Sequence, residues 1–183
     1  ITDISAGERN KVLGEAHFVR AWSYFQLVQF FGDLPLIDKE TKEFDYKVDR
    51  SPLKDIYALI VSDLVFASGD DILPTTIRDG HATHWAAKTL LGKVYLTMAS
   101  AKEAAKVGGY AAIDQPPAEL YRLAYDVLLD VKDNSGRDLE PVYGDVFKIK
   151  NKNTNKESIW EIQFSETVPY GTQWPKQLGI AHK

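Results

Sequence analysis

Histidines and cysteines are the residues that most often bind metals, and this chain has few of them. Its four histidines lie at positions 17, 81, 84 and 182, and it has no cysteine. His81 and His84 are three residues apart, a spacing that two metal ligands on one helical turn can use. No Cys or Glu nearby completes a ligand set, and Thr83 is expected to begin a helix between them. We therefore interpret both as surface or capping residues and predict neither a metal site nor a cofactor. His17 is interpreted as a packed or edge residue of a helix.

The carboxylates are numerous but scattered along the chain, which has 26 Asp and Glu residues. A glycosidase needs two carboxylates that face each other across a cleft, and the sequence marks out no such pair. The motifs G-x-S-x-G, the P-loop and G-x-G-x-x-G are also missing from it. A hydrolase is therefore a hypothesis without supporting residues, and we do not predict an enzyme.

The aromatic residues, 11% of the chain, are the more informative set. Most lie at helical spacing, which core packing explains: Trp22, Tyr24, Phe25, Phe30, Phe31, Trp85 and Tyr95. Tyr170 and Trp174 differ, because they follow no periodicity and lie in a stretch rich in proline and glycine. Rigid loop aromatics can stack on a sugar ring or on a partner protein. The two are our candidate ligand-binding residues, and the alternative is that they fold back over the helices as a lid.

Four helices are predicted to position these residues. The first spans residues 8–31 and has two apolar rows, listed as Val12, Ala16, Val19, Ser23, Leu27 and Phe30, then Phe18, Trp22, Phe25 and Val28. Such a helix is expected to be buried on most sides. It should end at Gly32 with a positive φ. A second helix is predicted after Ser51, its expected N-cap, and Pro52.

The third helix is predicted from Thr83 to about residue 105, and the fourth from Pro117 to about residue 134. Gly92 in the third helix is expected to allow close packing, since glycine there costs about 1 kcal/mol relative to alanine. Residues 146–149 are expected to be extended. Residues 158–164 alternate in polarity like a half-buried strand. The predicted fold is all-α, with antiparallel helix pairs of the tetratricopeptide type and one short β element near residues 158–164.

Composition limits the other possibilities. A net charge of −4 argues against a nucleic-acid-binding surface. No apolar stretch is long enough to cross a membrane, and no signal peptide is evident. A length of 183 residues fits a single domain, 1–183. Because the chain starts with Ile1, we expect it to be a processed product or a piece of a longer protein.

Several segments in order resemble the SusD/RagB family. The strongest is residues 15–36, EAHFVRAWSYFQLVQFFGDLPL, which is similar to the family's signature helix. Residues 50–74, 82–96 and 157–162 resemble further segments of the family, the last being ESIWEI. The resemblance covers nearly the whole chain but less than half of a typical member. We interpret five signature residues as structural: Glu15, Arg20, Gly32, Asp33 and Pro35.

The resemblance implies a binding protein, not an enzyme, on the outer face of the outer membrane of a Gram-negative bacterium. Such lipoproteins bind oligosaccharides or other nutrients and deliver them to a SusC-like TonB-dependent transporter. The lipid-anchor cysteine of the family does not occur in these residues. The alternative is a helical-repeat module that docks a protein or peptide and has no role in glycan binding. The sequence does not identify the glycan.

Overall fold

The computed structural model describes residues 4–40, 48–76, 80–104, 108–148, 151 and 154–162. Its four α-helices are α1 (Ala6–Phe31), α2 (Leu53–Ala67), α3 (His84–Glu103) and α4 (Pro117–Asn134). Two short 3-10 helices, η1 (Tyr110–Ala112) and η2 (Tyr143–Phe147), accompany them. None of the helices in these ranges is both long and apolar enough to span a bilayer.

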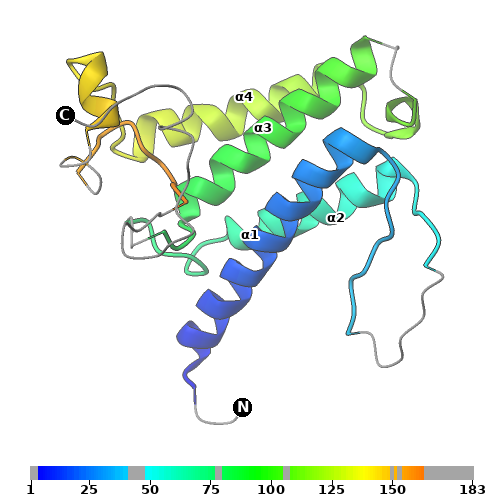
Figure 1. The fold of residues 1–183 in the computed structure, drawn as a ribbon, viewed down its shortest axis with the longest axis horizontal. Coiled ribbons are helices and arrows are strands. Elements are labelled where there is room, and N and C mark those ends of the chain that lie inside the picture. Colours follow the sequence, from blue (N-terminus) through cyan, green and yellow to red (C-terminus); the bar gives the residue numbers. More distant parts are fainter. Residues whose placement is uncertain are drawn as a thin grey trace.

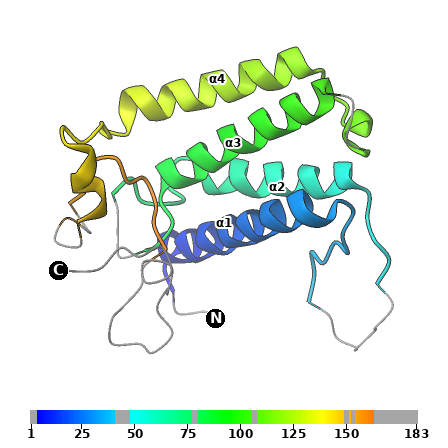
Figure 2. The same ribbon diagram turned by 45° about the horizontal axis from the view of Figure 1, so that its top comes forward.

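The four helices lie side by side in chain order, and each runs antiparallel to the one before (Figure 1). Figure 2 shows the resulting stack, with α1 and α4 on the two outsides and α2 and α3 between them. Helix α1 packs mainly on α2, and α4 packs on α3. The predicted all-α fold of antiparallel helix pairs is thereby confirmed.

Helix α1 begins with a capping box in which the Ser5 side chain accepts a hydrogen bond from Glu8 N, and the Glu8 carboxylate accepts one from Ser5 N. It ends at Gly32, which has the predicted positive φ of 67°. Only one of its two apolar rows is buried, around Phe18 and Phe25. The other row faces outward, so the expectation of burial on most sides is wrong.

The N-terminus of α2 is capped by a residue that is distant in the sequence. Ser51, the predicted N-cap, lies one residue too early: Pro52 holds the N-cap position and offers no side-chain cap. Instead the carboxylate of Asp33, twenty residues upstream, accepts a hydrogen bond of 2.8 Å from Leu53 N. Ser51 pairs with Leu34 in an isolated antiparallel bridge, with Ser51 N donating to Leu34 O at 2.7 Å. The loop ends are thus tied together where α1 turns into α2.

Helices α3 and α4 approach each other closely. Thr83 caps α3 as predicted, because its Oγ1 accepts a hydrogen bond from Ala86 N at 3.1 Å. A Cβ at Gly92 would lie 2.5 Å from Leu128 Cγ, so the glycine permits this approach. The core runs through the interior of the stack and includes Phe18, Phe25, Tyr57, Ile60, Leu64, Val94, Met98, Leu120 and Ala124.

The segment after α4 differs from the prediction in two places. Val146 and Phe147, expected to be extended, lie in η2. Residues 158–162, the described part of the predicted strand, form no β-ladder with any other described segment. A strand needs a neighbouring strand for its backbone groups, and this segment is anchored by side chains instead. Ile159 and Trp160 pack against the helical core.

Candidate functional site

An open cleft lies between α1, α3 and residues 157–160. Its volume is about 380 Å³, in the range of small-molecule sites. It is lined by Phe18, Trp22, Ala86, Thr89, Leu90, Lys93, Glu157, Ser158, Ile159 and Trp160. We call it the tryptophan cleft. It unites three segments that are far apart in the sequence.

Two tryptophans, Trp22 and Trp160, form the aromatic surface of the cleft. The ring of Trp160 meets that of Trp22 edge to face, with centroids 6.0 Å apart and planes inclined by 68°. It meets Phe18 in a similar way at 5.1 Å. Trp160 Nε1 donates a hydrogen bond of 3.0 Å to the carbonyl oxygen of Gly80, which fixes the indole. Trp22, expected in the core, is only partly buried and lines the cleft.

Polar groups from both walls complete the cleft. Thr89 Oγ1, on α3, is buried and has no hydrogen-bond partner among the described residues. Lys93 lies one helical turn further along α3 and adds a positive charge. Glu157, opposite, accepts a hydrogen bond of 2.8 Å from Glu140 N. Aromatic faces with a few hydroxyl and charged groups suit a ligand that is both flat and rich in hydroxyls.

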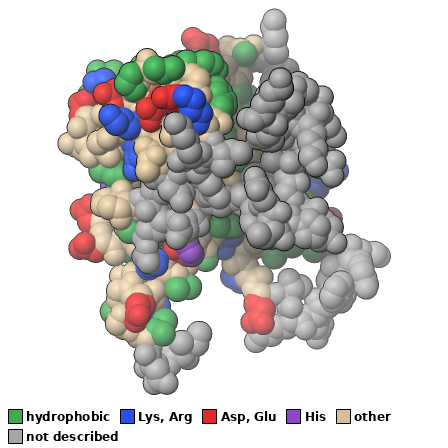
Figure 3. Space-filling view, turned by 60° about the vertical axis from the view of Figure 1, so that its left-hand side comes forward, with side chains coloured by type: hydrophobic (Ala, Val, Ile, Leu, Met, Phe, Trp, Pro, Cys, Tyr) green, Lys and Arg blue, Asp and Glu red, His purple; other side chains and the backbone are tan. Residues whose placement is uncertain are grey.

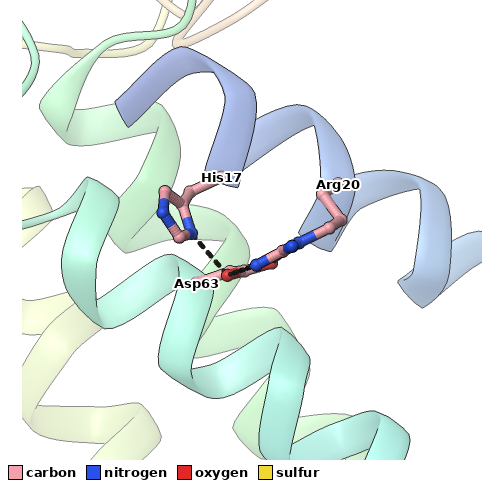
Figure 4. Close-up of polar contacts among 3 residues, drawn as sticks. All are labelled: His17, Arg20 and Asp63. Atoms are coloured by element: carbon pink, nitrogen blue, oxygen red, sulfur yellow. Dashed lines mark hydrogen bonds and ion pairs between the residues drawn. The ribbon is translucent and has the colours of Figure 1, made fainter. Parts of the chain in front are cut away.

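A buried ion cluster fixes α1 on α2 next to the cleft (Figure 4). Arg20 binds Asp63 through two hydrogen bonds, Nε–Oδ2 and Nη2–Oδ1, both 2.7 Å long. His17 Nδ1 lies 2.5 Å from Asp63 Oδ1. The Asp63 carboxylate raises the pKa of the Arg20 guanidinium above its ordinary value. The cluster sets the rotation of α1, and therefore the direction in which Phe18 and Trp22 point.

The other signature residues also lie in contacts between elements. Glu15 Oε1 lies 3.1 Å from His81 Nδ1. The carbonyl oxygen of Pro35 accepts a hydrogen bond of 3.2 Å from the Tyr24 hydroxyl, which in turn accepts one from Ile37 N at 2.8 Å. Pro35, like Asp33, thus fixes the chain that leaves α1, whereas Glu15 ties the middle of α1 to the segment before α3.

The predicted ligand residues Tyr170 and Trp174 lie outside the described residues. His81 and His84 do not come together: His81 pairs with Glu15, whereas His84 is buried against Trp85, with ring centroids 4.8 Å apart. Within the described ranges no three His, Cys, Asp or Glu residues are placed to hold a metal ion.

The structure adds residues that sequence reasoning missed. Asp63 stands in the apolar row of α2 between Ile60 and Leu64, and a charge in such a row signals a buried partner. Thr89 carried no comparable signal, because a threonine on a helix is unremarkable until its surroundings are known. Trp160 was expected in a strand, with no indication that it would reach the Trp22 ring.

Charges of both signs lie on the described surface. In the upper part of Figure 3, Lys and Arg side chains lie beside Asp and Glu side chains. Ion pairs of this mixed kind include Lys88 with Asp130 and Arg122 with Asp126.

Fold and cleft together define a stack of antiparallel helix pairs with an aromatic cleft. The model of a SusD-like family, described as "Starch-binding associating with outer membrane", matches residues 2–96, just over half of the chain. The chain therefore belongs to the SusD-like family.

Known relatives agree with this assignment. A SusD-like protein of Bacteroides ovatus is 37% identical over 174 residues, covering 93% of this chain and 29% of the relative. The SusD-like protein P2 of Formosa agariphila is 28% identical, covering 90% of this chain and 34% of the relative. The chain thus spans about a third of the length of these two relatives.

Solved structures show the same fold. One, a crystal structure with xylogluco-oligosaccharide, has a TM-score of 0.73 and 31% identity, and the match covers 91% of this chain and 32% of that one. A SusD superfamily protein of Bacteroides fragilis has a TM-score of 0.72 and 26% identity, with coverage of 91% and 32%. Both matches span almost all of the present chain.

Proposed function

We propose that this chain is part of a carbohydrate-binding protein that captures oligosaccharides at the outer membrane. The observation that carries the proposal is family membership, together with a 31% identical structure that contains a xylogluco-oligosaccharide. The proposed role is binding, because the described lining of the tryptophan cleft combines aromatic rings with hydroxyls, Lys93 and a single carboxylate, Glu157.

The tryptophan cleft is the proposed contact of these residues with the sugar. Sugar rings present apolar C–H faces and equatorial hydroxyls, so they pair with aromatic faces and with hydrogen-bonding groups at their edges. Trp22 and Trp160 supply the aromatic surface, and Thr89 supplies a hydroxyl that lacks a partner among the described residues. The Thr89 hydroxyl oxygen is enclosed, so a ligand hydroxyl reaches it only after a small shift of the cleft wall. The new hydrogen bond would then offset the cost of about 1–3 kcal/mol that an unpaired buried hydroxyl carries.

The test is calorimetry on the full-length protein with xylogluco-oligosaccharide and a panel of other neutral oligosaccharides. Thr89→Val keeps the side-chain shape but removes the hydroxyl, and should weaken binding about 3- to 10-fold without loss of stability. Thr97→Val is the matched control, because Thr97 Oγ1 lies two turns further along α3 and bonds to Lys93 O. If Thr89→Val binds like the wild type, the Thr89 hydroxyl takes no part in binding, and glycan binding is excluded if no oligosaccharide of the panel binds.

Tyr170 and Trp174 are proposed as a second contact with the sugar. They follow residues 157–160 in the chain by about ten residues, in a segment with Pro169, Gly171 and Pro175. Trp174→Ala should weaken oligosaccharide affinity while changing stability by less than about 0.5 kcal/mol. Loss of stability without loss of affinity would show instead that this tryptophan is a lid over the helices.

The proposed partner is a SusC-like TonB-dependent transporter in the outer membrane, to which the oligosaccharide is delivered at the extracellular face. Co-purification of the full-length protein with its transporter from outer membranes tests this step. The alternative function, protein or peptide docking without glycan binding, would use an apolar helical surface. Such a surface exists on α1, where Val12, Val19 and Phe30 are exposed.

A further inference from the structure

A closed series of contacts surrounds the Trp160 indole. On α1, Glu15 Oε1 lies 3.1 Å from His81 Nδ1, and because an ionised carboxylate only accepts hydrogen bonds, the His81 ring is the donor. The residue before it, Gly80, accepts a hydrogen bond of 3.0 Å at its carbonyl oxygen from Trp160 Nε1. The Trp160 ring then meets Phe18, with centroids 5.1 Å apart. Phe18 follows Glu15 by three residues on the same side of α1, so the series ends on the helix where it began.

The Gly80 carbonyl lies at the edge of a fixed stretch of chain. Ala82 and Thr83 are buried, at 5% and 2% exposure, and Thr83 caps α3. Gly80 itself has a φ of 83°, in a region of backbone conformation that glycine enters at little cost. Between the two, His81 reaches across to Glu15. This contact therefore supports the backbone at the point where its carbonyl group must face the indole.

We propose that Glu15 and His81 are positioning residues of the tryptophan cleft, which raise its oligosaccharide affinity by holding the Gly80 carbonyl toward Trp160. Neither belongs to the described lining of the cleft, so they act through the indole and not by touching the sugar. An indole that is held by its N–H group keeps one orientation before the ligand arrives, and less conformational entropy is then lost on binding. The proposal rests on the proposed function, because it concerns the affinity of the same cleft.

The first test is calorimetry on the full-length protein with the oligosaccharide that the wild type binds best. The Glu15 and His81 side chains are 25% and 55% exposed, so water competes for their contact and its effect is modest. Glu15→Ala and His81→Ala should each weaken affinity about 3- to 5-fold. His81→Asn should restore most of it, because the asparagine amide keeps a donor close to the position of Nδ1.

A matched control removes a comparable contact at the C-terminal end of α3. Glu103 accepts a hydrogen bond of 2.8 Å from the exposed Tyr121 hydroxyl, and Glu103→Ala should leave oligosaccharide affinity unchanged. The Trp160→Phe background then separates positioning from a general structural effect, because phenylalanine has no N–H for the Gly80 carbonyl. In that background His81→Ala should change affinity by less than about 1.5-fold. An equal loss in both backgrounds, or no loss in either, overturns the proposal.

The indole N–H gives a second readout that needs no ligand. In full-length protein with isotope-labelled tryptophan, the indole resonance of Trp160 is assigned by its disappearance in Trp160→Phe. Its hydrogen exchange should be about 3- to 5-fold faster in His81→Ala and unchanged in Glu103→Ala, because the bond to Gly80 opens more often. Unchanged exchange in His81→Ala overturns the proposal. If the wild type binds no oligosaccharide, the proposed function and the effect on affinity fail together, whereas faster exchange still supports the positioning of the indole.

Discussion

At the scale of single residues, Asp63 is the most constrained charge of the structure. It is 1% exposed, and both of its oxygens are bound by Arg20, with His17 as a third partner. A buried carboxylate is tolerated only when it is paired, because water no longer solvates it. Arg20, read from the sequence as structural, lies in this pair. Its partner Asp63 is 43 residues away and could be suspected only as a charge in an apolar row.

Replacing one member of the Arg20–Asp63 ion pair should destabilise the protein far more than replacing both members together. Arg20→Met leaves Asp63 buried with only His17 as partner, and we expect a loss of about 3 kcal/mol in the free energy of unfolding. The double variant Arg20→Met/Asp63→Leu should lie within about 1 kcal/mol of the wild type, because two apolar side chains fill the same space. Urea denaturation measures both. Additive losses in the double variant would contradict the burial argument.

His84 makes stability depend on pH. It is 7% exposed, and burial, followed by the positive charge of Lys88, lowers its pKa, while the nearby Asp70 and Asp130 act in the opposite direction. The unfolded state therefore takes up a proton at higher pH than the folded state. The contribution of the buried, neutral His84 to the free energy of unfolding is complete above about pH 6.5. This contribution is lost as the pH falls from there through the lower pKa of the folded state.

The prediction is that His84→Gln flattens this dependence. Urea denaturation between about pH 7.5 and pH 5 should show a smaller loss of stability in the variant than in the wild type, because glutamine does not titrate. An identical pH slope for the two proteins would mean that groups other than His84 account for the loss of stability in this range of pH.

At the scale of elements, helix ends were predictable where the signal is local. The Thr83 cap and the positive φ of Gly32 follow from neighbouring residues and were confirmed. The start of α2 was not predictable in the same way. Its cap comes from Asp33, which reaches Leu53 only because the intervening loop closes. A cap supplied over twenty residues leaves no local pattern.

Gly32 and Gly7 allow a controlled test of the α1 terminus. Gly32 has a φ of 67° with open space around a potential Cβ, so Gly32→Ala should cost about 1–2 kcal/mol from backbone strain alone. Gly7→Ala also meets no atom within 4 Å, but lies in the first helical turn, and should stabilise by about 0.5–1 kcal/mol. Thermal denaturation compares the two. A melting temperature for Gly32→Ala at or above that of the wild type would contradict the predicted backbone strain at position 32.

The contact between α3 and α4 depends on Gly92. A Cβ there would lie 2.5 Å and 2.6 Å from Leu128 Cγ and Cδ2. Gly92→Ala should therefore destabilise by about 1–3 kcal/mol despite the better helix propensity of alanine. Gly92→Ala combined with Leu128→Ala should recover part of this loss, because the clashing atoms are gone. If the losses of the two single variants simply add, the predicted clash does not occur.

The sequence did not reveal which side of α1 is buried. Both of its rows are apolar, so periodicity shows two apolar faces but not which of them meets α2. Gly14 helps to decide this, since a Cβ there would lie 2.6 Å from Ile72 Cγ2. The predicted strand failed for a related reason: alternation describes where side chains point, whereas a strand also needs a partner, and none is found among the described residues.

At the scale of the whole molecule, the fold was predictable and the cleft was not. Consecutive elements usually pack side by side, and four successive helices therefore favour a stack of antiparallel pairs. The tryptophan cleft, by contrast, arises from Trp22, Thr89 and Trp160, whose separations in sequence are about seventy residues each. Their proximity follows from how the pairs stack and where the chain after α4 returns, which no local pattern encodes.

The charge of the whole molecule yields a last prediction about its ligand. The net charge is only −4, charges of both signs are interspersed, and the cleft contains one Lys and one Glu on opposite walls. A neutral oligosaccharide bound there gains little from the long-range field.

Raising the salt concentration from about 0.1 M to about 1 M shortens the Debye length from about 10 Å to about 3 Å, and should change the calorimetric affinity for a neutral oligosaccharide by less than about twofold. An acidic oligosaccharide held by Lys93 would instead lose affinity steeply over the same range, and Lys93→Met would abolish that salt dependence. A tenfold or greater salt effect on the preferred ligand would therefore assign the cleft to acidic glycans and overturn the preference for neutral ones.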